Sequence, residues 1–387
     1  MSDPYDLAIL GAGCAGLSLA RELIRHGYSK RAVIVEPREV YTHDRTWCFW
    51  ASGQHELSDL VSKRWSHWQL STLRQTVDHR GSGFSYQQIR SDDFYQAHLA
   101  KVARRSNIKL RQGVTAGQIS DQDDHVLIET TAGAISARRV IDTRPRSPQH
   151  DQATLWQIFS GAEVETDEAC FDPSVAGLMQ QMTSDESGLK FTYILPMTAH
   201  AALIQTTRFA LRKTAPETLD REFERDLRTS FKTKTKIRRR ERGCLPMGQT
   251  RQNPHPSDRV LRAGQAAGVL RASSGYGFLR IQAWAESTAE ELASGQRLLA
   301  KPYGSPLERK MDAIFLAAMT RSPHAAADWF ARIADQLSGD EFGRFMSQSP
   351  SLHLWLKVVS SLPKAPFVRA LLAGMPEIDR ADHQVAT

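Results

Sequence analysis

The tightest constraint on the fold lies in the first 36 residues, where a glycine-rich turn separates two short apolar segments. Residues 5–10 read as a buried strand, residues 17–26 have the apolar spacing of a helix, and residues 31–36 read as a second apolar strand. The turn reads Gly11-Ala-Gly13-Cys-Ala-Gly16, and the second strand ends in Glu36. Strand, glycine turn, helix, strand and acid in this order predict a dinucleotide-binding βαβ unit.

Each residue of this pattern has a physical role in such a unit. Gly11 permits the tight turn, Gly13 lets the backbone approach a pyrophosphate, and Gly16 lets the helix pack closely on the strand. The helix N-terminus favours the anion. Glu36 lies 20 residues after Gly16, where a carboxylate can accept hydrogen bonds from ribose hydroxyls. A glycine-rich turn of another α/β fold stays open as the alternative on this segment alone.

A second glycine-rich segment favours FAD over NAD as the dinucleotide. Residues 259–268 read as a strand that enters a turn, and a further turn at 273–277 leads into a helix over 278–291. This segment resembles the one that carries the FAD pyrophosphate and ribityl chain, with Gly264, Gln265, Gly275 and Tyr276 as candidate cofactor contacts. Gln265 stands where that segment usually carries an acid. Upstream, residues 107–111, 125–130 and 134–140 read as short strands, and residues 139–144 as a strand that returns to the nucleotide sheet.

Further segments are similar, in order and spacing, to those of one flavoprotein family. They are residues 43–50, 89–94, 140–144, 155–165, 191–196, 241–247, 263–268 and 274–276, and they include Phe191-Thr-Tyr-Ile-Leu-Pro196. On these segments the chain resembles the lycopene cyclases, the bacterial carotenoid β-cyclases and their plant relatives. The resemblance covers nearly the whole chain.

The resemblance implies an α/β protein with an FAD-binding, Rossmann-type flavoprotein fold, an inserted antiparallel-sheet substrate domain and a helical C-terminal region. We expect a discontinuous FAD-binding domain at residues 1–150 and 255–300, a substrate-binding sheet domain at 151–254, and the helical region at 301–387. Within that region residues 311–319, 325–337, 339–346 and 352–359 have helical spacing, and Pro363 and Pro366 break its end. These helices cover the substrate mouth, lie on a bilayer or only complete the core.

The resemblance also implies a reaction. Lycopene cyclases convert the linear ends of lycopene into six-membered rings by protonation, ring closure and deprotonation, without net redox change. Family members need reduced FAD, and NAD(P)H is the expected electron source. The chemistry suits a dry apolar tunnel with one carboxylic acid, because burial raises a carboxyl pKa and makes the group a proton donor. The alternatives are a flavin-dependent monooxygenase or halogenase on the same scaffold, acting on a hydrophobic isoprenoid, and a flavin-binding protein without catalysis.

Two positions that carry carboxylates in the family hold amides in this chain, namely Gln205 and Gln180. An amide cannot protonate an alkene, so either the flavin or another acid must supply the proton. We expect Glu241 to be the substitute, with Gln205 orienting a substrate double bond or hydrogen-bonding the flavin. The competing interpretation makes Glu241 a surface partner of Arg239 or Arg242. The other candidate acids are Asp185, Glu186 and Glu163.

Aromatic side chains in the family segments have two possible roles. They line a carotenoid tunnel and stabilise a cation through their π-faces, or they belong to the ordinary core. The residues concerned are Trp47, Phe49, Trp50, Trp65, Trp68, Trp156 and Tyr276. His43 and Asp44, in the same region, form either a structural pair or part of the catalytic site.

The distribution of charged residues along the chain suggests a binding partner. The chain of 387 residues has 50 Lys and Arg against 43 Asp and Glu, and much of the excess lies in residues 228–242. With an isoprenoid substrate, this stretch favours an anionic membrane surface over nucleic acid, and a solvated face is the alternative. The sequence has no secretory signal and no apolar run long enough to span a bilayer, so we expect a cytoplasmic protein peripheral to the inner face of the membrane.

The four cysteines Cys14, Cys48, Cys170 and Cys244 fit neither a zinc site nor a disulfide framework, and no metal is expected. The oligomeric state stays open.

Overall fold

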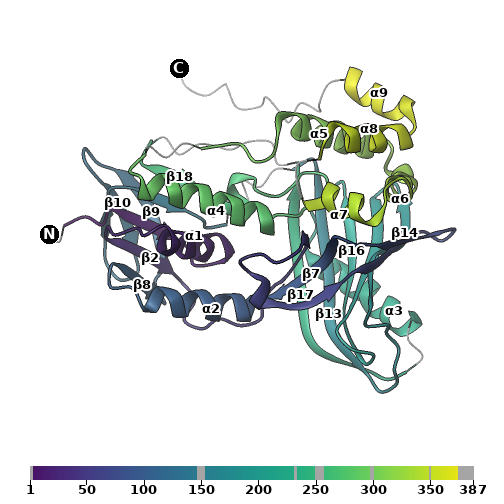
Figure 1. The fold of residues 1–387 in the computed structure, drawn as a ribbon, viewed down its shortest axis with the longest axis horizontal. Coiled ribbons are helices and arrows are strands. Elements are labelled where there is room, and N and C mark those ends of the chain that lie inside the picture. Colours follow the sequence, from purple (N-terminus) through teal and green to yellow (C-terminus); the bar gives the residue numbers. More distant parts are fainter. Residues whose placement is uncertain are drawn as a thin grey trace.

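The computed structural model describes residues 3–145, 153–230, 233–248, 257–296, 300–347 and 350–373. The predicted domain limits at 1, 150, 151, 254, 255 and 387, and the basic residue Lys232, lie outside the described residues. Figure 1 shows a nucleotide-binding half with a parallel sheet, a half built on one long sheet, and the C-terminal helices gathered at one end of the long sheet.

The nucleotide half is a five-stranded parallel sheet in the order β18-β12-β1-β2-β8. Its strands are β1 (Leu7–Leu10), β2 (Ala32–Glu36), β8 (Ile108–Gln112), β12 (Val140–Asp142) and β18 (Val260–Arg262). The helices α1 (Cys14–Arg25), α2 (Ser91–Ala103) and α4 (Phe278–Ala293) pack together beside it. The return of the chain to this sheet in β12 and the helix after the second glycine segment are therefore confirmed.

Alternation along β1 explains why the sheet is covered on both faces. Leu7 and Ile9 belong to the core shared with the helices, whereas Ala8 and Leu10 belong to the core on the opposite face. That opposite face is covered by a small antiparallel sheet of β9 (Ala116–Asp121), β10 (Val126–Thr130) and β11 (Ile135–Ala137). Strands buried on both faces are apolar throughout, which is why residues 7–10 and 32–35 read so clearly as strands.

The second half is a seven-stranded sheet in the order β17-β13-β16-β15-β14-β5-β6. Its strands are β5 (His67–Ser71), β6 (Thr76–Arg80), β13 (Leu155–Thr166), β14 (Val175–Asp185), β15 (Gly188–Pro196), β16 (Ala201–Ala210) and β17 (Thr235–Met247). All neighbours are antiparallel except β14 and β5. The expected boundary at residue 150 does not separate the two sheets, because β5 and β6 precede it and yet extend the large sheet.

A three-stranded sheet connects the two halves (Figure 1). It consists of β3 (Thr46–Ser52), β7 (Phe84–Arg90) and β4 (Val61–Trp65), in that order β3-β7-β4. In the described residues, short 3-10 turns complete the connections, namely η1 (Ser58–Leu60), η3 (Pro216–Leu219), η4 (Gly264–Ala267) and η5 (Pro323–Ala325). Strand β3 brings residues of the nucleotide half to the face of the large sheet, where the candidate site lies.

The C-terminal region contains one helix more than the sequence predicts. Its helices are α5 (Pro306–Arg321), α6 (Ala326–Gln336), α7 (Gly339–Ser347), α8 (Leu352–Ser361) and α9 (Lys364–Leu372). The prediction that Pro363 and Pro366 end the helical region was wrong. Pro363 lies at the N-cap of α9 and Pro366 lies in its first turn, where a backbone N–H has no acceptor within the helix, so proline is tolerated.

The basic stretch of residues 228–242 spans the end of α3 (Asp220–Ser230) and most of β17. Four of its arginines are paired with carboxylates, which lowers the free positive charge of this face. The pairs are Arg238 with Glu165, Arg239 with Glu163 and Glu241, Arg240 with Glu224, and Arg242 with Asp220. In the described part of the chain, no helix is both long enough and apolar enough to cross a bilayer.

Candidate functional site

The first glycine turn brings the N-terminus of α1 close to the ends of β1 and β2. A side chain at Gly16 would collide with the carbonyl of Gly11, and a Cβ at Gly11 would lie 2.7 Å from the Thr143 hydroxyl. Glu36 is buried at the end of β2 and accepts hydrogen bonds from the Ala12 N–H at 2.6 Å and from Arg38 Nε at 2.6 Å. The turn therefore holds the backbone at close approach, as the sequence predicts for a dinucleotide site.

The second glycine segment lies beside the first. Gly264 adopts a left-handed conformation (φ +69°), and a Cβ on it would lie 3.2 Å from Cβ of Ala15 in the first turn of α1. Gly275 is also left-handed (φ +73°) and leaves no room for a side chain against Gln157 of β13. The structure thus brings together Gly11, Gly16 and Gly264 around the start of α1, while Gly275 faces the large sheet.

Two further observations fit a bound dinucleotide at this place. Among the described residues, no side chain caps the N-terminus of α1 or α4, and neither first turn carries an acid. The side-chain oxygens of Gln157 and Ser274, beside Gly275, are buried without a hydrogen-bond partner among the described residues. Uncapped helix N-termini attract anions, and buried polar atoms need partners. The region around the two glycine segments therefore offers donors and acceptors for phosphate and ring groups.

Gln205 and Glu241 meet on the face of the large sheet. They lie on β16 and β17, on either side of β13, and both are in register with Gly161. The Gln205 amide donates a hydrogen bond to Oε1 of Glu241. Gly161 makes this contact possible, because a Cβ there would lie 2.5 Å from Cγ of Gln205 and would also strike the Ile204 carbonyl. Sequence spacing could not reveal the pair, since 36 residues separate its members.

Glu241 is a buried carboxyl group with several donors around it. Its second oxygen, Oε2, accepts hydrogen bonds from the Thr46 hydroxyl at 3.0 Å and from Arg239 at 2.8 Å. Burial raises the pKa of Glu241 and outweighs the opposing effects of Arg239 and Thr46. Glu241 is thus not a surface ion pair, although its contact with Arg239 was anticipated. Sequence reasoning missed Thr46 as its third partner, even though this threonine belongs to a family segment.

A polar chain leads from Glu241 toward solvent. His43 Nε2 lies 3.4 Å from the Thr46 hydroxyl, and His43 Nδ1 lies 3.4 Å from the carboxylate of Glu163. Glu163 is also 3.1 Å from Arg239. Burial and the charge of Arg239 lower the pKa of His43, so its neutral form is favoured. His43 and Asp44 do not form the pair considered from the sequence, since Asp44 instead accepts the Tyr95 hydroxyl at 3.1 Å.

The other candidate acids and the second amide lie elsewhere. Asp185 and Glu186 are exposed at the tip of the β14–β15 hairpin, and Asp185 accepts hydrogen bonds from Ser187. Gln180 accepts a hydrogen bond from the Ser71 hydroxyl at 3.0 Å and donates one to the Gln69 carbonyl at 2.7 Å, which tie β14 to β5. The two amides that replace family acids therefore do not share a site.

Three buried tyrosines form a cluster beside Gln205. Tyr193 is in register with Gln205, and its hydroxyl contacts that of Tyr276, which lies 3.2 Å from the Tyr86 hydroxyl. Burial raises the pKa of Tyr193 to about 12. Neutral hydroxyls therefore connect the large sheet with the loop of residues 273–277, to which Tyr276 belongs.

Beyond that loop lies an apolar cavity of about 260 Å³. Helices α5 to α9 form most of its wall, Leu70 and Met179 of the large sheet contribute one side, and Ser273 and Ser274 another. Its aromatic lining residues are Phe315, Phe330, Phe342, Phe345, Trp355 and Phe367. An apolar wall with few polar groups suits an isoprenoid chain.

None of the aromatics that the sequence singled out lines this cavity, within the part of the chain that the structure describes. Trp50, Trp65 and Trp68 are fully buried in the core between the sheets and the helices. Trp47 and Phe49 stack instead on Phe278 of α4, with ring centroids 5.4 and 5.0 Å apart. The aromatic residues that line the apolar cavity come instead from the C-terminal helices.

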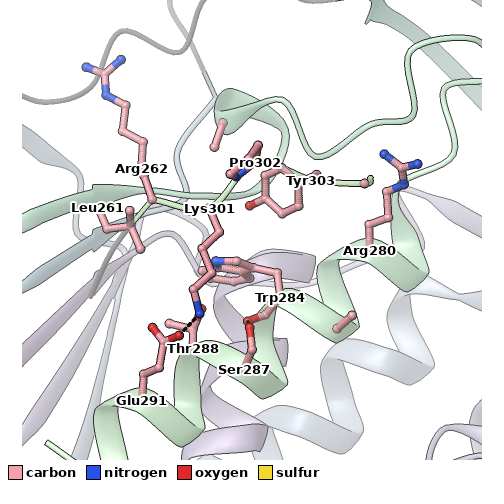
Figure 2. A pocket seen from close by; sticks show the side chains of 14 residues that line it. Leu261, Arg262, Arg280, Trp284, Ser287, Thr288, Glu291, Lys301, Pro302 and Tyr303 are labelled. Atoms are coloured by element: carbon pink, nitrogen blue, oxygen red, sulfur yellow. Dashed lines mark hydrogen bonds and ion pairs between the residues drawn. The ribbon is translucent and has the colours of Figure 1, made fainter. Parts of the chain in front are cut away.

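A second cavity, of about 250 Å³, lies on the outer side of α4. Figure 2 shows its charged side chains, in which the ammonium of Lys301 points to the carboxylate of Glu291. Arg280, also on this wall, pairs with Glu308 of α5. Its wall thus combines apolar residues such as Leu261 and Trp284 with charged side chains, unlike the wall of the first cavity, which is almost wholly apolar.

Residues 6–372 match the family described as lycopene cyclase protein. The chain belongs to the lycopene cyclase family. A lycopene beta-cyclase of Pseudescherichia vulneris is 26% identical over 299 residues, which cover 74% of this chain and 73% of that protein. A lycopene beta cyclase of Synechococcus elongatus is 22% identical over 307 residues, which cover 75% of this chain and 72% of that protein. The resemblance found in the sequence is thereby confirmed.

Solved structures confirm the flavoprotein fold expected for this cyclase family member. A geranylgeranyl bacteriochlorophyll reductase-like protein of Thermoplasma acidophilum superposes with a TM-score of 0.57 at 14% identity, covering 96% of this chain and 99% of that one. The p-nitrophenol 4-monooxygenase PnpA of Pseudomonas putida gives a TM-score of 0.55 at 14% identity, covering 96% and 98%. At such identities the likeness concerns the fold alone.

Proposed function

We propose that this protein is an FAD-dependent cyclase that closes β-ionone-type rings at the ends of lycopene or a related polyene. The reaction is an isomerisation, since the proton added to the chain end is balanced by the proton lost from the new ring. It belongs to carotenoid biosynthesis and to the intramolecular lyases. The proposal is supported by family membership and, in this chain, by the buried Glu241 carboxyl beside Gln205.

Glu241 is the proposed proton donor. A carboxylic acid protonates an alkene only from its neutral form, and burial favours that form by raising the pKa of Glu241. The Gln205 amide hydrogen-bonds Oε1 and fixes the carboxyl group across Gly161. We therefore assign Gln205 a positioning role, which an amide can perform although it cannot donate the proton.

When the proton lost from the new ring leaves to solvent, the Glu241 carboxylate must be reprotonated before the next turnover. The Thr46 hydroxyl and His43 link Glu241 to Glu163, whose side chain is 21% exposed. Because His43 is favoured in its neutral form, it can accept a proton at one nitrogen while the other nitrogen carries one. This chain is the proposed proton route.

FAD is the proposed cofactor, held by Gly11, Gly13 and Gly16 with Glu36 at the adenosine end, and by Gly264, Gln265, Gly275 and Tyr276 at the flavin end. The fit rests on the uncapped N-termini of α1 and α4 and on the unpartnered oxygens of Gln157 and Ser274. When bound in its reduced form, with NAD(P)H as electron source, FAD would supply negative charge that stabilises a cationic transition state.

The apolar cavity is the proposed place of the polyene chain, since its wall excludes water and offers aromatic faces. We further propose a cytoplasmic enzyme that acts at the inner face of the membrane, where such a substrate is dissolved.

The test is product analysis by chromatography after incubation of the protein with lycopene, FAD and a reductant. The wild type should yield β-ring products, and Glu241→Gln should lower the rate by about 10²–10⁴-fold, the usual contribution of a general acid. Glu165→Gln is the matched control, because Glu165 lies on β13, the strand paired with β17, but is exposed and pairs with Arg238. It should keep full activity.

Unchanged lycopene with NADPH oxidation on another isoprenoid would instead identify a flavin monooxygenase. Ring formation by Glu241→Gln at the wild-type rate would refute the role of Glu241.

A further inference from the structure

Exposed apolar side chains gather on the last two helices. Nine large apolar side chains are exposed in the described part of the chain, and six of them belong to α8 and α9. These six are Leu352, Leu356, Val359, Val368, Leu371 and Leu372, and we call them the apolar patch. Such clustering marks a surface that is covered in the working protein, because scattered exposure needs no explanation but a contiguous patch does.

The patch follows from the sequence of α8. Leu352, Leu356 and Val359 are spaced by four and three residues and share one face of the helix. The opposite face carries Leu354 and Val358, which are buried in the core. A helix that is apolar on both faces needs a second apolar environment besides the protein core.

The patch is continuous with the apolar cavity. Val359, Val368 and Leu371 line the cavity and are also 37%, 49% and 52% exposed. Figure 1 shows α8 and α9 at one end of the molecule, on the outside of α5. An apolar chain that leaves the cavity past these three residues therefore meets the patch without crossing a polar surface.

The charged residues of α8 and α9 indicate which kind of surface covers the apolar patch. Residues 351–373 contain Lys357, Lys364 and Arg369 and no acidic residue. In contrast, the arginines of residues 228–242 are largely paired with carboxylates. Lys357 pairs with Glu341 of α7, whereas Lys364 and Arg369 have no carboxylate partner among the described residues. Apolar side chains flanked by these two cations match a bilayer with anionic headgroups, where each cation near the surface adds to binding.

We propose that α8 and α9 dock into the surface layer of an anionic lipid bilayer and that the polyene passes between lipid and cavity across the apolar patch. The proposal deepens the proposed function, on which it rests for the identity of the substrate. It also moves the membrane contact from the basic stretch of β17 to the C-terminal helices.

The test compares vesicle binding by flotation with vesicles of neutral lipid and with vesicles that contain one quarter anionic lipid. The variant Leu356→Gln/Leu372→Gln changes two patch residues that do not line the cavity, and it should bind anionic vesicles at least tenfold more weakly than the wild type. The control variant Val40→Gln/Leu73→Gln changes two apolar residues that are 74% and 78% exposed but lie outside the patch, and it should bind as the wild type does. Lys364→Gln/Arg369→Gln should weaken binding only to anionic vesicles, and salt should weaken it likewise.

Activity separates this proposal from the proposed function. The patch variant should cyclise lycopene in detergent at the wild-type rate and lycopene in vesicles at least tenfold more slowly. Equal vesicle binding by patch variant and wild type, at equal thermal stability, would overturn the docking proposal. So would a wild type that binds no vesicles and forms dimers that the patch variant does not form, because a second copy of the chain would then cover the patch. Vesicle binding without cyclisation in detergent would refute the proposed function and leave the docking intact.

Discussion

The contact between Gln205 and Glu241 depends on the missing side chain of Gly161, and the variant Gly161→Ala tests that dependence. Gly161 is buried on β13 in ordinary extended backbone, so alanine would not be strained by its own conformation. Its Cβ would lie 2.5 Å from Cγ and 2.8 Å from Cα of Gln205. The Cα and the Ile204 carbonyl belong to the backbone of β16 and cannot rotate away, so β13 and β16 must separate locally.

Overpacking of this kind costs about 1–3 kcal/mol, which corresponds to a drop of about 1–4 °C in Tm for a chain of this size. Separation of the strands also removes the hydrogen bond from Gln205 to the Glu241 carboxyl. A hydrogen bond to a neutral carboxyl group contributes about 0.5–1.5 kcal/mol, so ring formation should slow by about two- to tenfold.

The assay is thermal melting together with the initial rate of β-ring formation from lycopene in detergent. Gly117→Ala serves as control, because its Cβ would make only ordinary contacts with Glu129, from 3.6 Å outward. Melting and rate should both be unchanged in the control. If Gly161→Ala keeps both the Tm and the rate of the wild type, Gly161 is not the residue that permits the contact, and the reasoning fails.

Three further predictions follow from the titratable groups. Activity should fall as the pH rises through the raised pKa of Glu241. The variant Thr46→Val removes a hydrogen-bond donor that favours the carboxylate, so it should move this fall to higher pH in a pH–rate profile. Burial raises the pKa of Asp340, but hydrogen bonds from Ser82 and from the Gly83 and Phe84 N–H groups outweigh this effect and lower the pKa. The stabilisation of the fold by the Asp340 carboxylate is therefore present at neutral pH and lost in acid. The Tm difference between wild type and Asp340→Asn should vanish as the pH falls through that pKa. Burial raises the pKa of Cys14 to about 12 and that of Cys48 further. A thiol reagent should therefore modify the exposed Cys170 in the native protein and reach Cys14 and Cys48 only after denaturation. A Cys170→Ser variant that still reacts at once would contradict this prediction.

Local chemistry explains what the sequence could predict of the fold. Residues 7–10 and 32–36 are buried on both faces and Gly11 and Gly16 permit one close turn, so the nucleotide unit is encoded within 36 residues. Helix α9 was missed because Pro366 reads as a breaker, whereas its place in the first turn makes it harmless. The place of β5 and β6 in the large sheet was not predicted, because their partner, β14, lies far along the chain.

The candidate site was predictable in its members but not in its geometry. The departure of Gln205 from the family pattern and the nearby acid Glu241 both stand in the sequence. Their contact depends on sheet register around Gly161, and the burial that raises the pKa of Glu241 depends on Thr46 and its strand, which come from the other half of the molecule. The cavity aromatics could not be separated from ordinary core residues, because both kinds give the same apolar helix spacing.

The parallel pairing of β14 with β5 limits how this protein can be divided. Val175 is paired with His67 and Gly177 with Gln69, so a hairpin made early in synthesis completes a sheet whose other strands are made much later. Residues 153–248 are therefore not a transplantable module. A chimera that exchanges them between two cyclases would leave β14 with an unmatched edge unless residues 67–80 travel with them. Recombination of substrate preference within this family should accordingly succeed only at crossovers that keep both segments from one parent.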